Sequence, residues 1–118
     1  MILLFGSTGF VGTSVHEYLT TRGKDVTRVT RNDYDMTRPD NLSKLQKYDD
    51  VDTVIWCSGF NRNDRMGHLV HSTYDDIMNV NINAVTKSMD YLLHNKKIKK
   101  GARLCIISSI LEEKSRVN

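Results

Sequence analysis

Gly6-Ser7-Thr8-Gly9-Phe10-Val11-Gly12 is the stretch that decides the fold of this 118-residue chain. It directly follows the continuous apolar run of residues 1–5, which is typical of a strand buried on both faces. It opens an amphipathic pattern that has Gly23 as its candidate C-cap and Val11, Val15, Tyr18 and Leu19 as its apolar positions. The sequence therefore predicts a strand, a tight glycine turn and a helix, in that order.

The three glycines of this turn have the spacing that binds a diphosphate. Gly6 permits the tight turn, Gly9 lets the backbone approach a pyrophosphate, and Gly12 allows the helix to pack closely on the strand. Free N–H groups at the helix start, together with the helix dipole, favour phosphate there. We expect residues 6–12 to bind the pyrophosphate of a dinucleotide, the alternative being a turn with no ligand. A P-loop is excluded because no Gly-Lys-Ser/Thr occurs.

Further strands and helices alternate along the chain. Compact apolar runs predict buried strands at residues 54–57 and 104–107, a weaker one at 26–30 and a very short one near Asp35-Met36. Helices are predicted from about Pro39-Asp40, and from about residue 72 to residue 95. This alternation predicts a single α/β domain over residues 1–118, a doubly wound, Rossmann-like parallel sheet of about five strands with flanking helices.

Composition and charge exclude several classes of protein. Hydrophobic residues make up 39% and charged residues 26%, a balance that excludes disordered and fibrous chains. The net charge of +3 does not indicate a nucleic-acid partner. No apolar run approaches the ~20 residues of a membrane span, and the first residues lack a signal-peptide pattern. Cys57 and Cys105 lie in apolar runs, as buried cysteines of a reducing compartment do. We expect a cytoplasmic protein with no membrane partner.

The end of the second predicted strand indicates which dinucleotide binds. An acidic residue there would accept the adenosine ribose hydroxyls and repel a 2′-phosphate. The sequence instead has Thr30 and Arg31, with no acid until Asp33. Because a guanidinium suits a phosphate, NADP(H) is favoured over NAD(H). The alternative is an arginine that only faces solvent.

These motifs together resemble the short-chain dehydrogenase/reductase superfamily. The glycine turn is similar to that of its extended members, which include sugar-nucleotide epimerases. Asp35-Met36-Thr37 resembles the family element whose acid and following backbone hold the adenine. Cys57-Ser58-Gly59 falls where the family has Asn-Ala-Gly, which lines the nicotinamide ribose. The family's Val-Asn-x-x-Gly is similar to Val80-Asn81-Ile82-Asn83-Ala84, which implies that Asn81 is the structural and proton-relay asparagine. The family's Ile-Ser-Ser is similar to Ile106-Ile107-Ser108-Ser109, which implies that Ser109 is the catalytic serine.

The chain departs from that family in two respects. Almost nothing separates the second strand from Asp35, so the usual intervening helix is missing. This shortening resembles the dTDP-4-dehydrorhamnose reductase-like members and some very small reductases. The Tyr-x-x-x-Lys pair expected about a dozen residues after Ser109 is also missing, and no tyrosine present has a lysine four residues later. Such a tyrosine would donate the proton that a reduced carbonyl needs. We therefore expect the cofactor-binding front part of a longer reductase, and a homo-oligomer because the last strand would lie uncovered.

Three functions remain open. The first is an NADP(H)-dependent oxidoreductase acting on a small carbonyl or alcohol. The second is a non-catalytic dinucleotide-binding module, and the third an extended-type sugar-nucleotide epimerase or reductase. His68, His71 and Asp75 have a spacing that can hold a metal on a helix, but solvated histidines are the favoured interpretation and no metal is predicted.

Overall fold

The apolar runs of the sequence form one parallel sheet. A computed structural model describes residues 1–57, 67 and 70–107. Within this part of the chain the sheet has four strands in the order β2-β1-β3-β4. The strands are β1 (Ile2–Phe5), β2 (Val26–Val29), β3 (Val51–Trp56) and β4 (Ile98–Ile106), and every neighbouring pair is parallel. The predicted Rossmann-like α/β class is confirmed.

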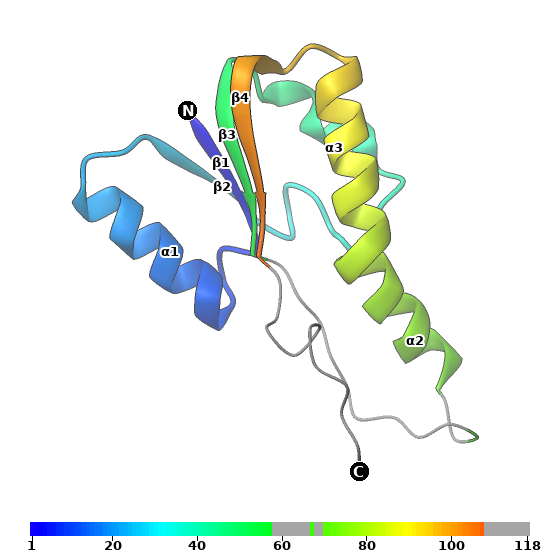
Figure 1. The fold of residues 1–118 in the computed structure, drawn as a ribbon. Helices are drawn as coiled ribbons and strands as arrows, with labels where there is room; N and C mark the ends of the chain where they lie inside the picture. The colour runs from blue at the N-terminus through cyan, green and yellow to red at the C-terminus, as the bar shows by residue number, and fades with distance from the viewer. Residues whose placement is uncertain (58–66, 68–69, 108–118) are drawn as a thin grey trace.

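Helices cover both faces of this sheet. Helix α1 (Phe10–Thr21) lies on one face, and the 3-10 helix η1 (Leu42–Lys47) and helix α3 (Ala84–His94) lie on the other (Figure 1). Helix α2 (His71–Met78), a π-helical turn η2 (Asn79–Asn83) and α3 follow one another without a break, as the single pattern at residues 72–95 predicts. Among the described residues, no helix combines the length and the hydropathy that crossing a bilayer requires.

Two predicted elements differ from the structure. No strand forms at Asp35-Met36, so the described sheet has four strands rather than about five. The chain turns directly after β2, since the backbone N–H groups of Asp33 and Tyr34 both donate to the carbonyl of Thr30, at 3.0 Å each. The helix predicted from Pro39-Asp40 is the shorter η1. Tight local hydrogen bonding therefore replaces the extended backbone that a further strand would need.

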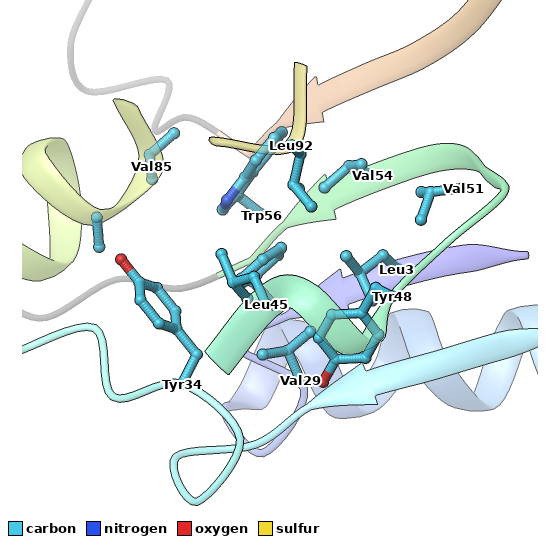
Figure 2. Close-up of a cluster of buried hydrophobic side chains, with 12 residues drawn as sticks. Leu3, Val29, Tyr34, Leu45, Tyr48, Val51, Val54, Trp56, Val85 and Leu92 are labelled. Atoms are coloured by element: carbon cyan, nitrogen blue, oxygen red, sulfur yellow. The ribbon is translucent and has the colours of Figure 1, made fainter. Parts of the chain in front are cut away.

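The core lies between the sheet and the layer formed by α3 and η1. Figure 2 shows side chains of β1, β2 and β3 meeting Leu45 of η1 and Val85 and Leu92 of α3. The ring of Phe5 stacks on that of Trp56, with centroids 5.5 Å apart, and meets Tyr34 edge-on at 6.1 Å. Since Phe5 is the last residue before the glycine turn, this packing anchors the turn to the core.

Candidate functional site

The glycine turn is shaped by close backbone contacts. Gly6 has φ of 74°, a left-handed conformation that favours glycine. A Cβ atom on Gly12 would lie 1.8 Å from the carbonyl oxygen of Gly6, so only glycine fits where α1 crosses β1. A Cβ on Gly9 would lie 3.7 Å from the same oxygen, an ordinary contact. Gly12 therefore serves packing, whereas Gly9 leaves space above the turn.

The start of α1 offers donors to an anion. Gly9 is the N-cap, no side chain of the described residues caps the helix, and no acidic residue lies in its first turn. The first N–H groups of a helix have no partner within the helix and carry the positive end of its dipole. Ser7 lies beside them and is only 3% exposed, yet its hydroxyl has no hydrogen-bond partner among the described residues. A buried hydroxyl without a partner is unfavourable and fits a site that a polar ligand completes.

A cleft of about 300 Å³ opens at the carboxyl ends of β1 and β2. It is lined by eleven residues from the glycine turn, the segment after β2, and the π-helical turn η2: Gly6, Ser7, Thr8, Val29, Thr30, Arg31, Tyr34, Asp35, Met36, Thr37 and Val80. In open α/β sheets ligands bind beyond the carboxyl ends of the strands, next to the first βα turn. The cleft thus lies where a dinucleotide binds in folds of this class, and the donors around it have the chemistry that a dinucleotide requires.

The first acidic residue after β2 is bound by its neighbours beside this cleft. Oδ2 of Asp33 accepts hydrogen bonds from the backbone N–H of Thr30 at 3.0 Å and from its hydroxyl at 2.8 Å. The ammonium of Lys47 contacts the other carboxylate oxygen at 2.5 Å. The hydrogen bonds from Lys47 and Thr30 lower the pKa of Asp33 to about 2. Asp33 is therefore ionised and fully engaged, and it does not line the cleft.

Arg31 and Asp35 face each other across the next turn. Nε of Arg31 lies 3.3 Å from Oδ2 of Asp35, and the Arg31 side chain is 80% exposed. Oδ1 of Asp35 accepts from the backbone N–H of Thr37 at 3.0 Å and from its hydroxyl at 2.7 Å. Burial acts to raise the pKa of Asp35, but the hydrogen bonds from Thr37 and the charge of Arg31 outweigh it and lower the pKa. Because this ion pair uses Nε, and no other described residue pairs with Arg31, its two terminal nitrogens could bind an anion.

The π-helical turn η2 connects the long helix to this cleft. The side-chain amide of Asn79 donates to the carbonyl of Thr37 at 3.2 Å, and that of Asn83 donates to Oδ1 of Asn79 at 2.9 Å. These bonds hold Val80 at the cleft, and Asn81, whose side chain is exposed, follows it in the same turn. Turns of π-helix inside α-helices occur frequently at functional sites. Sequence reasoning missed Asn79 because its partner lies 42 residues away.

The structure brings together part of the predicted cofactor site. Seven predicted residues line the cleft: Gly6, Ser7, Thr8, Thr30, Arg31, Asp35 and Met36. The side chains of Phe10 and Val11 lie elsewhere, in an apolar groove between α1 and β3. Cys57 follows β3, donates its N–H to the carbonyl of Phe5 at 2.9 Å and does not line the cleft, and burial raises the pKa of its thiol. Ser58, Gly59 and Ser109 lie outside the described residues.

Metal ligation has no support from the described residues. In that part of the chain no three His, Cys, Asp or Glu side chains gather closely enough to hold an ion. His68 of the predicted alternative lies outside the described residues.

Fold and site together define a Rossmann-type dinucleotide-binding architecture. The family described as RmlD substrate binding domain matches residues 1–98, and the chain belongs to it. The resemblance to short-chain dehydrogenases/reductases is thereby confirmed, since this family is one of their extended type. No curated protein matches the chain.

Solved structures of similar fold are longer than this chain. The protein lin1944 of Listeria innocua is 20% identical with a TM-score of 0.76, and the match covers 95% of this chain and 57% of that one. A double mutant of the short-chain dehydrogenase/reductase of Serratia marcescens is 16% identical with a TM-score of 0.79, covering 98% and 59%. A dTDP-4-dehydrorhamnose reductase of Clostridium acetobutylicum is 19% identical with a TM-score of 0.64, covering 87% and 34%. At these identities the likeness shows the fold alone.

Proposed function

We propose that this chain binds NADP(H) and forms the cofactor-binding part of an oxidoreductase of the short-chain dehydrogenase/reductase type. The substrate class is a small carbonyl or alcohol. The observation that carries the proposal is the cleft at the ends of β1 and β2, where the glycine turn meets Thr30, Arg31 and Asp35. The family supports a nicotinamide dinucleotide in general, and the residues of the cleft support NADP(H) in particular.

Three parts of the cofactor have a matching group among the described residues. The helix start at Gly9 and the hydroxyl of Ser7, which has no partner among the described residues, suit the pyrophosphate. Asp35 and the backbone of Met36 suit the adenine, as the family resemblance implies. The terminal nitrogens of Arg31 suit a 2′-phosphate, because a guanidinium binds phosphate through two parallel hydrogen bonds.

The reaction that follows is hydride transfer between the nicotinamide ring and the carbonyl or hydroxyl carbon of the substrate. Ser109 would donate a hydrogen bond to the carbonyl oxygen and polarise it. Asn81 would take part in the proton relay from its place in η2. A serine alone is a poor acid, so the proton itself requires a tyrosine activated by a lysine, and no tyrosine of these 118 residues has a lysine four residues later.

Titration of the chain with NADPH and with NADH tests the proposal. Trp56, the only tryptophan, reports binding because it stacks on Phe5, the residue before the glycine turn. We expect saturable quenching with tighter binding of NADPH, confirmed by calorimetry. Arg31→Ala should weaken the binding of NADPH about tenfold or more and leave the affinity for NADH nearly unchanged.

Arg28→Ala is the matched control for the loss of one positive charge. Arg28 is an exposed residue of β2 that does not line the cleft, so its removal should leave the preference for NADPH intact. Absence of a fluorescence change and of calorimetric heat with both nucleotides would contradict the proposal. Equal weakening of NADH and NADPH in Arg31→Ala would contradict the assignment of Arg31.

A sugar-nucleotide reductase is the second candidate, favoured by the match to the RmlD family. Assays of nucleotide-linked keto sugars beside simple ketones, with the intact gene product, distinguish the two. Binding of the nucleotide without turnover of either substrate would instead favour a non-catalytic module. The expected burial of both cysteines is not confirmed, because Cys57 is half-buried and Cys105 is exposed. A cytoplasmic location stays a proposal, which two free cysteines support.

A further inference from the structure

The turn after β2 carries a negative charge next to the cleft. The carboxylate of Asp33 is bound to both the N–H and the hydroxyl of Thr30, and Thr30 itself lines the cleft. These two bonds fix the carboxylate at the end of β2, where the proposed 2′-phosphate would lie beside Arg31. An uncompensated carboxylate at this place would repel a phosphate.

One lysine from a separate element compensates this charge. The ammonium of Lys47, in the last turn of η1, contacts Oδ1 of Asp33, the oxygen that Thr30 does not use. The same ammonium lies 5.4 Å from the centroid of the Tyr48 ring, and Tyr48 is buried in the core. The core thus positions η1, and η1 brings the positive charge of Lys47 to Asp33, 14 residues earlier in the chain.

We propose that Lys47 is a specificity-determining residue, which makes the site accept the 2′-phosphate of NADP(H) by neutralising Asp33. The inference rests on the proposed function and deepens it. Lys47 acts through Asp33 and is therefore a positioning residue, whereas Arg31 is the proposed direct phosphate ligand. The pair of Asp33 and Lys47 explains how a chain with an acid four residues after the end of β2 can still favour the phosphorylated cofactor.

The geometry favours a role of Lys47 in cofactor specificity over a role in the stability of the fold. The side chain of Lys47 is 54% exposed, and ion pairs exposed to this degree contribute little to folding. Without Lys47 the carboxylate would still be held by its two bonds to Thr30. Replacement of the lysine therefore changes the charge near the cleft while it leaves the turn in place.

Four variants test the proposal through the ratio of the dissociation constants for NADH and NADPH. Lys47→Ala should lower this ratio about three- to tenfold, mainly by weakening NADPH. Lys47→Arg should keep the ratio, because the positive charge remains. In the double variant Lys47→Ala/Asp33→Asn the ratio should return to that of the wild type. Lys44→Ala, which removes an exposed lysine of η1 with no ion pair among the described residues, should leave it unchanged.

The outcomes separate this inference from the proposed function. If the wild-type chain binds neither nucleotide, the proposed function fails. If the wild type binds NADPH but Lys47→Ala changes the dissociation constants for both nucleotides equally, only the role of Lys47 is overturned. If the double variant Lys47→Ala/Asp33→Asn binds NADPH as weakly as Lys47→Ala does, the role of Lys47 is likewise overturned, since Lys47 would then contact the phosphate directly. Added salt should reduce the difference between wild type and Lys47→Ala, as screening requires.

Discussion

At the scale of single residues, two glycines of the same turn have separate tasks. Gly12 has no room for a side chain, because its Cβ position lies 1.8 Å from the carbonyl oxygen of Gly6 and 2.8 Å from Cα of Ser7. Gly9 has an ordinary extended backbone and open space above it. Gly12 is needed for the fold, and Gly9 is needed only where a ligand approaches.

Alanine substitutions should separate these two tasks. Gly12→Ala should cost about 3 kcal/mol or more of the free energy of unfolding, because backbone atoms of the turn must move. Gly9→Ala should cost about 1 kcal/mol or less but weaken NADPH about tenfold or more, since the methyl group occupies the approach of the pyrophosphate. Urea unfolding and nucleotide titration of both variants measure these effects. A stable Gly12→Ala protein would contradict the close packing.

At the scale of elements, one buried hydrogen bond joins α3 to β3. The indole N–H of Trp56 donates to the hydroxyl of Ser88 at 3.1 Å, and both residues are almost fully buried. The hydroxyl of Ser88 in turn donates to the carbonyl of Val85 at 3.2 Å. This contact sets the position of the long helix on the sheet, and hence of the π-helical turn η2 at the cleft.

Ser88→Ala should therefore destabilise the protein more than its small change in volume suggests. The buried indole N–H would lose its partner, at a cost of about 1–3 kcal/mol in urea unfolding. Ser14→Ala, at an exposed serine of α1, is the control and should change stability by about 0.5 kcal/mol or less. In the double variant Trp56→Phe/Ser88→Ala the loss should be smaller than the sum of the single losses. Additive losses would argue against the hydrogen bond.

At the scale of the whole molecule, β4 has an apolar surface that the described chain does not cover. Leu104 and Ile106 pair with Val54 and Trp56, so they point to the face that carries α3. They are nevertheless 38% and 52% exposed, whereas their partners are buried. An open sheet edge with an apolar face is prone to association. We propose that a second copy of the chain covers it, as expected for a homo-oligomer.

Sedimentation of the purified chain tests this proposal. The wild type should self-associate, and the double variant Leu104→Ser/Ile106→Ser should associate about tenfold more weakly or not at all. Tyr18→Ser removes an exposed apolar side chain from the opposite face and should leave association unchanged. A wild type that remains monomeric at the highest soluble concentration would refute the role of this surface.

Local patterns predicted much of the fold and part of the site. The turn at residues 6–12 depends on steric limits within seven residues, so its glycines were sufficient to predict the strand, the turn and α1. The strand predicted at Asp35-Met36 was wrong because turn hydrogen bonds compete with extended backbone: the carbonyl of Thr30 accepts from Asp33 and Tyr34, and the N–H of Thr37 donates to the Asp35 carboxylate. Apolar periodicity could not reveal the π-helical turn η2, since a single inserted residue hardly alters the pattern of a long helix.

The amino-acid sequence alone determined the class of fold, the glycine turn at residues 6–12 and the placement of Arg31 after β2, because neighbouring residues and short periodicities control all three. Only the tertiary structure decided which charges neutralise one another and which polar atoms are buried. One example is the pairing of Asp33 with Lys47, and another is the buried hydroxyl of Ser7, which no described residue contacts by a hydrogen bond. Charge interactions and burial depend on distances between segments that only packing brings together.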